Sequence, residues 1–343
     1  MVDVTIRGAG IFGLSVAWVC VQRGAKVQIV DPHGPGAGSS GGVVGALAPH
    51  VPENWNEKKA FQLESLLMAP EFWGDVEKTG QRSSGYKNTG RIQPILDENG
   101  LSLAQKRSET ANVLWQGKAS WHVEKISGAG WCPASPTGWF IRDTLSALLH
   151  PRQAIHALCA ALLARNVSIV ERAPDQGKVL WATGIAGLEM LNTTHHRMMG
   201  TGVKGQAAVL KFDARGAAQL FVDGVHIIPH LNGTVAIGST SERDYTSPTS
   251  TDSQLDDVIK KARSVLPILS DAAVLERWAG IRPRTRSRAP MLGQWSGQDG
   301  HFIANGGFKI GFGMAPKIAH VMADLMLNGK DEIPEGFRVN ASR

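Results

Sequence analysis

Three glycines near the start of the chain have the spacing of a phosphate-binding turn. Gly8, Gly10 and Gly13 lie between two short apolar stretches, and the second stretch ends at Asp31. The first glycine permits a tight turn, the second lets a pyrophosphate approach the backbone, and the third lets a helix pack closely on a strand. Unpaired N–H groups at the start of that helix attract a phosphate. The spacing therefore predicts dinucleotide binding, with Asp31 hydrogen-bonded to an adenosine ribose, which favours NAD or FAD over NADP.

A second glycine-rich stretch follows between Pro32 and His50, with six glycines before Ala46. So much glycine lets the main chain lie against a flat ligand and present its N–H groups to it. The apolar residues from Val43 to Ala48 indicate that this loop is tucked inward, whereas a flexible surface loop is the alternative interpretation. His50, at the end of the loop, either faces the ligand or closes the loop.

Four arginines alternate with other residues in the last quarter of the chain: Arg282, Arg284, Arg286 and Arg288. On a regular strand they would share one face over roughly 20 Å, which suits a track for an anion. A solvated strand edge is the plainer interpretation for all of them except Arg282.

Histidines and cysteines give no complete set of metal ligands. His226 and His230 would share one face of a β-like stretch, but a metal site needs at least a third ligand. Cys20, Cys132 and Cys159 have no metal-ligand spacing. We therefore predict no bound metal and interpret the cysteines as buried free thiols.

The elements that position these residues follow from apolar periodicity. Residues 2–31 read as strand, glycine turn, helix and strand, which is a βαβ unit. Helices are further predicted at 56–77, as two helices interrupted at Pro70, and at 151–165, 252–266 and 317–327. Strands or extended segments are predicted at 85–96, 138–142, 167–171, 178–184, 206–211, 220–229, 234–240 and 277–291, and a last strand with a glycine turn at 301–316.

This order is α/β at both ends of the chain, with antiparallel strands between. It predicts an α/β (α+β) fold, in which a Rossmann-like dinucleotide-binding domain carries an inserted antiparallel-sheet substrate domain. Two domains also suit a chain of 343 residues. The nucleotide domain is predicted at 1–80, 141–195 and 276–343, and the substrate domain at 81–140 and 196–275.

Composition narrows the partners without selecting one. No apolar run reaches the roughly 18 residues that span a bilayer, so a cytoplasmic protein without a membrane span is expected. The formal net charge of +6 suits anionic partners. A phosphate-bearing cofactor, a carboxylate substrate and nucleic acid all meet that description.

Three separated motifs occur in one order along nearly the whole chain. They are the turn Gly8–Gly13 with Asp31, the turn Ala182–Gly184, and the segment Trp278–Pro283 together with the turn Gly307–Gly313. In this combination the sequence resembles the flavin-dependent D-amino acid oxidase family. Within the family it is most similar to glycine oxidases and monomeric sarcosine oxidases.

The resemblance implies FAD as the cofactor and oxidation of an amino acid C–N bond by hydride transfer to the flavin. FAD is expected to be noncovalent, because no cysteine lies where sarcosine oxidases attach it. The residues that the resemblance places along FAD are Gly8, Gly10, Gly13, Asp31, Ser39, Ser40, Gly41, Gly42, Ala46, Gly184, Gly307, Gly311 and Phe312.

Three further residues match positions that serve the substrate in this family. Arg282 matches the arginine that holds the substrate carboxylate in glycine oxidases, and we expect it to be the primary anchor. Lys309 matches the lysine that serves the carboxylate in sarcosine oxidases, and we expect it to set the charge near the flavin. His226 corresponds to a pocket tyrosine, and as a histidine it is expected to change charge near neutral pH.

Two other hypotheses stay open at this point. The stretch from Gly45 to His50 also resembles the flavin domain of an enzyme that acts on the carboxymethylaminomethyl group of tRNA wobble uridine, and the arginine series would suit a phosphate backbone. A NAD-dependent dehydrogenase without flavin is the third hypothesis, in which the turn Gly306–Gly313 has no role. Oxygen, a quinone or another electron acceptor would reoxidise a flavin, and the sequence does not determine the oligomeric state.

Overall fold

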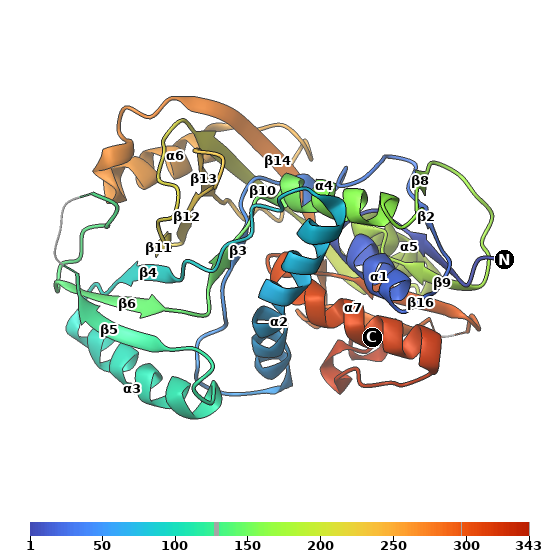
Figure 1. Cartoon of the computed structure of the whole chain (residues 1–343). Helices are drawn as coiled ribbons and strands as arrows, with labels where there is room; N and C mark the ends of the chain where they lie inside the picture. Colours follow the sequence, from blue (N-terminus) through green and yellow to red (C-terminus); the bar gives the residue numbers. More distant parts are fainter. Residues whose placement is uncertain (127–129, 296, 343) are drawn as a thin grey trace.

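The computed structural model describes residues 1–126, 130–295 and 297–342. In Figure 1 a parallel sheet with its helices lies on the right, and a larger antiparallel sheet lies on the left. Helix α5 (Gly184–Thr194) contacts β16 (His301–Asn305) of the parallel sheet and also β10 (Gly200–Leu210) and β14 (Val274–Thr285) of the antiparallel sheet. The two sheets are therefore joined by packing as well as by the chain.

The parallel sheet has six strands within the described residues, in the order β15, β16, β9, β1, β2, β8. Neighbours run parallel except at the edge, where β15 is antiparallel to β16. The other strands of this sheet are β1 (Val4–Arg7), β2 (Val27–Val30), β8 (Ile169–Val170), β9 (Lys178–Trp181) and β15 (Met291–Gln294). In open sheets of this kind ligands bind beyond the carboxyl ends of the strands.

Helices cover both faces of the parallel sheet, which explains its continuous apolar strands. In β16, Phe302 and Ala304 face the core that includes helix α1, whereas Ile303 faces the core that includes helix α5. The first core is formed with α1 (Ile11–Gln22), α2 (Glu57–Gly80), α4 (Pro151–Leu163) and α7 (Gly311–Asn328). Because α1 packs against α4 and α7 as well as the sheet, its residues from Ile11 to Cys20 are all buried.

The antiparallel sheet has eight strands in the described part of the chain, in the order β14, β10, β13, β12, β11, β4, β6, β5. Its neighbours run antiparallel except β11 and β4, which pair in parallel, so the predicted purely antiparallel sheet is mixed at this point. Helix α6 (Ser253–Val265) buries Leu255 and Ile259 against the sheet residues Ile227 and Ile237. Helix α3 (Glu98–Leu114) packs beside β5. The remaining strands are β4 (Arg91–Pro94), β5 (Trp121–Lys125), β6 (Trp139–Asp143), β11 (Gln219–Val222), β12 (Val225–Pro229) and β13 (Val235–Gly238).

Short elements complete the fold. Strands β3 (Ala46–Leu47) and β7 (Ala147–Leu148) pair with each other. Turns of 3-10 helix lie at Ser39–Gly41, Pro267–Leu269, Glu335–Phe337 and Val339–Ser342. No helix among the described residues is both long enough and apolar enough to cross a membrane.

Several predicted elements differ in the structure. The stretch 56–77 is one helix rather than two, because Pro70 lies inside α2 while Phe61, Leu66 and Trp73 stay on its buried side. The last helix begins at Gly311, so Pro316 lies within it instead of before it. The extended segment 277–291 was too long a prediction, because β14 ends at Thr285 and Arg286 and Arg288 lie beyond it.

Two helices were missed altogether. Helix α3 fully buries only Ala104 and Ala111 among its described residues, so its apolar periodicity is weak. Helix α5 begins with Gly184 and contains Gly187, both of which lower helix propensity.

Candidate active site

A large cavity of about 1120 Å³ lies over the carboxyl ends of β1, β9 and β16. This volume is near the upper end of the roughly 300–1,000 Å³ of small-molecule sites, so the cavity has room for a ligand of dinucleotide size. One side is lined by the glycine turns of the parallel sheet, and the other by β12, β14 and Ser39–Ala46.

Three helices begin at the wall of this cavity. Residues of their first turns line it, namely Ile11 and Phe12 of α1, Gly184 and Ile185 of α5, and Gly311 and Phe312 of α7. Since the side chains of these first turns are uncharged, the positive end of each helix dipole is left for a ligand. Three such ends at one cavity favour an extended anionic molecule.

The first turn has its shape because two of its glycines cannot be replaced without a clash. Gly8 has φ +105°, and a Cβ there would lie 2.4 Å from the carbonyl oxygen of Ala182. A Cβ on Gly13 would lie 1.9 Å from the carbonyl oxygen of Gly8. Gly8 and Gly10 line the cavity, whereas Gly13, the third cofactor candidate of this turn, lies behind them and packs α1 onto the turn.

Asp31 lines the cavity beyond the end of β2 and holds the glycine turn in place. Its Oδ2 accepts a hydrogen bond from the N–H of Ala9 (2.7 Å), and its Oδ1 accepts one from the N–H of His33 (2.9 Å). A carboxylate has capacity for further acceptor bonds, so this arrangement leaves Asp31 able to bind a ribose hydroxyl.

The second glycine-rich loop folds inward, as its apolar end indicated. Four of its five candidate residues line the cavity: Ser39, Ser40, Gly42 and Ala46. Ser40 also accepts a hydrogen bond from the N–H of Ile11 (3.0 Å), which ties the loop to α1. Gly41 lies behind the lining, where its carbonyl oxygen accepts a hydrogen bond from Arg152 Nε (2.8 Å).

The last glycine turn closes the cavity between α5 and α7, and Gly307, Lys309, Gly311 and Phe312 all line it. Asn305 orders this turn, because its Oδ1 accepts from the N–H of Gly306 (2.7 Å) and its Nδ2 donates to the carbonyl of Gly184 (2.8 Å). Sequence reasoning missed Asn305, although a polar residue between a buried strand and a glycine pair is a usable signal.

Arg282 extends from β14 into the cavity across a pair of glycines, where no side chain blocks its path. Gly280 of β14 lies opposite Gly205 of β10, and a Cβ on Gly205 would lie 1.9 Å from Arg282 Nη1. Arg282 Nη2 donates to Ser239 Oγ (2.7 Å), and Nη1 donates to the carbonyl oxygen of Thr240 (3.2 Å). Burial lowers the pKa of Arg282 to about 10, so the guanidinium is still charged at neutral pH.

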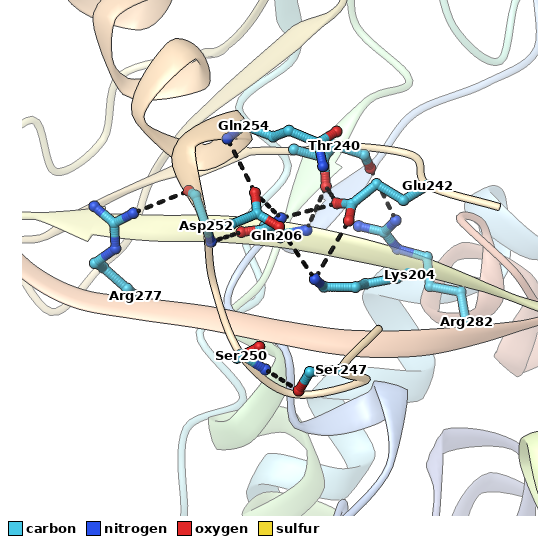
Figure 2. A network of polar contacts seen from close by, with 10 residues as sticks. All are labelled: Lys204, Gln206, Thr240, Glu242, Ser247, Ser250, Asp252, Gln254, Arg277 and Arg282. Atoms are coloured by element: carbon cyan, nitrogen blue, oxygen red, sulfur yellow. Dashed lines mark hydrogen bonds and ion pairs between the residues drawn. The ribbon is translucent and has the colours of Figure 1, made fainter. Parts of the chain in front are cut away.

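A buried polar network lies behind Arg282 and fixes Thr240, whose carbonyl accepts from that arginine (Figure 2). The N–H of Gln206 donates to Thr240 Oγ1 (2.8 Å), and that hydroxyl donates to Glu242. Gln206 Nε2 also donates to Glu242 Oε1 (3.0 Å). Thr240, one of the two acceptors of Arg282, is therefore fixed by its hydrogen bond with Gln206 of β10.

The same network contains a buried ion pair. Lys204 Nζ lies 3.3 Å from Glu242 Oε2 and 3.5 Å from Asp252 Oδ2, and only 2% of Lys204 and 7% of Glu242 is exposed. The Glu242 carboxylate raises the pKa of Arg282 against the larger effect of burial. Lys204, Gln206, Thr240 and Glu242, with the exposed Asp252 at their edge, are called the buried network below.

Lys309 reaches the cavity from the last glycine turn and lies among like charges. Its Nζ lies 5.7 Å from the centroid of the Phe308 ring, and Cζ of Arg284 lies 5.4 Å from the same centroid. Although Lys309 is exposed as a residue, desolvation of its ammonium group is the main cause of a lowered pKa, followed by the charges of Arg282 and Arg284.

His226 lines the cavity from β12, but its expected change of charge near neutral pH is wrong. Burial is the main cause that lowers its pKa to about 3, and the nearby Arg91, Lys309 and Arg282 charges act in the same direction. The imidazole is therefore neutral across the physiological range. Its Nδ1 has no hydrogen-bond partner within the described part of the chain.

Other candidates lie away from the cavity. His50 closes a loop, because its N–H and its ring both bond to Gln62. His230 packs against His150 with ring centroids 4.5 Å apart and the ring planes tilted by 39°. No group of three potential metal ligands occurs among the described residues. Of the four arginines only Arg282 lines the cavity, and Arg286 and Arg288 lie past the end of β14.

The fold and the cavity are those of a dinucleotide-dependent oxidoreductase, in which a parallel sheet faces a second, mostly antiparallel sheet across the cavity. The chain belongs to the DAO family of FAD-dependent oxidoreductases, whose family model matches residues 3–325. This result selects FAD over NAD and sets aside the dehydrogenase without flavin.

Among its relatives, glycine oxidase from Bacillus subtilis (strain 168) is 31% identical over 354 residues, which covers 95% of this chain and 93% of the relative. The bifunctional protein ThiO/ThiG from Trichormus variabilis is 25% identical over 362 residues, which covers 96% of this chain and 53% of the relative. The chain thus spans about half the length of that bifunctional relative. An iminodiacetate oxidase structure from Chelativorans sp. BNC1 shares the fold, with a TM-score of 0.84 and 19% identity over 98% of each chain.

The cavity fits FAD on its own geometry. The unsubstituted backbone of the first turn, the three helix starts and Asp31 suit a pyrophosphate and a ribose. The cysteines lie elsewhere, with Cys20 and Cys159 inside α1 and α4 and Cys132 in the segment before β6.

Proposed function

We propose that this protein oxidises the C–N bond of a small amino acid or N-alkyl amino acid, with FAD bound noncovalently in the cavity. The observation that carries the proposal is Arg282, a charged and half-buried guanidinium aimed into a cavity whose opposite end suits a dinucleotide. Its planar fork matches the geometry of a carboxylate. The two similar proteins named above, a glycine oxidase and an iminodiacetate oxidase, act by name on the same class of substrate.

The chain's own groups supply binding and orientation. Arg282 holds the substrate carboxylate, and the buried network keeps the guanidinium from swinging away, so the carbon that is oxidised has a fixed position. Lys309 adds positive charge near the reacting end, and neutral His226 offers a hydrogen bond from the wall. The proposed FAD contacts are those of the lining: Gly8, Gly10, Asp31, Ser39, Ser40, Gly42, Ala46, Gly184, Gly307, Gly311 and Phe312.

FAD, when bound, would accept the hydride, which is one proton with two electrons, that leaves the substrate carbon. The substrate amine must be neutral for this step, and it loses its proton to water or buffer as the imine forms. Hydrolysis of the imine then gives the carbonyl product and the free amine. The electron acceptor is oxygen or a quinone-like molecule, and release of hydrogen peroxide would identify oxygen.

The test is anaerobic mixing of the yellow holoprotein with glycine, sarcosine, iminodiacetate, proline and D-amino acids. Bleaching of the flavin absorbance by one of these compounds is the expected result. A protein that takes up no FAD, or whose flavin none of them bleaches, would contradict the proposal. The tRNA-directed alternative has no support from the relatives named above, and salt-sensitive tRNA binding without bleaching by any amino acid would favour it.

A further inference from the structure

Six cations lie at or near the substrate end of the cavity. Arg282 and Lys309 line it, and Arg284 lies over the same Phe308 ring as Lys309. Lys58 is hydrogen-bonded to the backbone of Arg288, and Arg243 and Arg288 are near enough to Arg284 to lower its pKa. None of the six makes an ion pair within 4.0 Å in the described part of the chain, whereas arginines elsewhere do, as Arg107 does with Glu53 (2.7 Å). We call Lys58, Arg243, Arg284, Arg288 and Lys309 the rim cations.

The fold holds these charges together by short-range contacts. The N–H of Phe308 donates to the carbonyl oxygen of Pro283 (3.1 Å), so the last glycine turn is fixed to β14 between Arg282 and Arg284. The Phe308 ring then carries Arg284 on β14 and Lys309 on the turn, at 5.4 Å and 5.7 Å from its centroid. A ring face stabilises a cation, which lets two of them stay close without a carboxylate.

At the rim itself, Lys58 Nζ donates to the carbonyl oxygen of Arg288. Desolvation is the main cause of the lowered pKa values of Lys58 and Arg284, and nearby like charges act in the same direction. After desolvation, Arg288 and Arg284 lower the pKa of Lys58, and Arg288 and Arg243 lower that of Arg284. Unpaired like charges at one site disfavour the compact state and attract anions to the cavity.

The acidic side chains do not balance this charge. Asp31 is the acidic residue of the cavity lining in the described part of the chain, and it lies at the end that suits the ribose. Glu242 lies behind Arg282, where its carboxylate already forms an ion pair with Lys204. One substrate carboxylate on Arg282 would leave Lys309 and Arg284 without a counter-charge.

We propose that the substrate carries a second anionic group, so that Arg282 holds the carboxylate next to the reacting carbon while Lys309 and Arg284 receive a distal carboxylate beside Phe308. The substrate class is a small amine with two carboxylates. This inference rests on the proposed function and narrows it. Arg284 lies on β14 and Lys309 lies on the last glycine turn, so the fold fixes both positions relative to Arg282. The distal site should therefore bind best when the two substrate carboxylates have one particular spacing.

The experiment compares two substrates that differ by one carboxylate, sarcosine and iminodiacetate. In the holoprotein, iminodiacetate should have a kcat/KM at least about tenfold above that of sarcosine, because charge-assisted hydrogen bonds are strong. Lys309→Met and Arg284→Met should each lower the ratio of the two kcat/KM values by about tenfold. Arg165→Met removes an exposed arginine at the opposite end of α4 from the cavity and should leave the ratio unchanged.

A second readout needs no turnover. Titration of the holoprotein with malonate and with acetate, followed by the flavin spectrum, should show tighter binding of malonate, and both variants should remove the difference. Equal loss for sarcosine and iminodiacetate in Lys309→Met would mean that Lys309 and Arg282 share one carboxylate, and would overturn the inference. A wild-type preference for sarcosine would overturn it as well.

The outcomes separate this inference from the proposed function. If sarcosine bleaches the flavin and iminodiacetate does not, the second anionic group is wrong and the proposed function stands. If no amine bleaches the flavin, both are wrong. Salt-sensitive tRNA binding that both variants abolish, with an unchanged substrate ratio, would assign the rim cations to a polyanion and overturn the inference.

Discussion

The two ends of the cavity are built in different ways. At the end proposed for FAD the wall consists of backbone turns in which a Cβ would clash, as at Gly8 and Gly13. At the end proposed for the substrate it carries two long charged side chains, Arg282 and Lys309, whose positions depend on the buried network and on an aromatic ring.

This difference indicates which end of the cavity can change its residues while the fold is kept. A backbone cradle recognises parts that every FAD shares, and it tolerates almost no substitution. Side chains on strands and turns can be exchanged while the fold is kept, so the substrate end sets specificity. Predictions at the first end therefore concern the presence of the cofactor, and those at the second concern the choice and affinity of the substrate.

The largest effect is expected for Gly8→Ala. The substitution costs about 1–2 kcal/mol for the left-handed backbone and roughly 1–3 kcal/mol for the clash with Ala182. FAD content after purification and denaturant unfolding measure the loss. Gly24→Ala is the control, because Gly24 has φ +85° and a Cβ there meets no atom of the described residues within 4 Å. Equal effects of the two substitutions would show that the clash contributes nothing.

Removal of the Asp31 carboxylate should have the next largest effect. Asp31→Ala loses a charge-assisted hydrogen bond to the ribose of about 1.5–3 kcal/mol, together with its bonds to Ala9 and His33. FAD affinity should fall tenfold or more, as measured by titration of the apoprotein. Unchanged affinity would place the ribose elsewhere.

A smaller effect is expected behind Arg282. Glu242→Gln keeps the shape of the side chain but leaves Lys204 with a weaker counter-charge, at a cost to unfolding stability of roughly 1–3 kcal/mol. The looser Arg282 should raise KM more than it lowers kcat. Glu332→Gln is the control, since it weakens an exposed ion pair with Lys330. Normal KM in Glu242→Gln would show that the buried network serves stability alone.

The smallest effect is expected for the pH profile of His226→Phe. Because His226 is neutral in the fold with a pKa of about 3, substrate affinity of both proteins should have the same pH dependence from pH 6 to 9. Its folded pKa lies below its unfolded value of about 6.5, so His226 destabilises the fold as pH falls from 6.5 toward 3. His226→Phe should reduce this acid sensitivity in unfolding experiments. A titration near pH 7 that the variant lacks would contradict the buried, neutral imidazole.

The sequence was a good guide where neighbours in sequence are also neighbours in space. The turn Gly8–Gly13 and Asp31 belong to one βαβ unit, so their spacing alone predicted their arrangement. Arg282 and Lys309 were found through the resemblance to a family, and both line the cavity.

Other features depend on contacts between distant segments, and the sequence could not predict them. The buried network combines β10 with the segment from Thr240 to Asp252, and its members alternate with ordinary residues. The neutral charge of His226 arises from burial beside Arg91, Lys309 and Arg282, which come from three other parts of the chain. Of the rim cations, Arg284 and Arg288 belong to the alternating arginine series, for which the sequence favoured a solvated strand edge over an anion track, and β14 ends before Arg286.

The binding of acetate to FAD-loaded Arg282→Ala, followed by the flavin spectrum, tests most directly whether Arg282 anchors the substrate carboxylate. If Arg282 is the carboxylate anchor, acetate should bind about tenfold to a hundredfold more weakly than to the wild type, because one charge-assisted contact is lost. FAD affinity should be unchanged, since the cofactor end is built from other residues. Wild-type affinity for acetate would contradict the account and assign the anchoring role to Lys309.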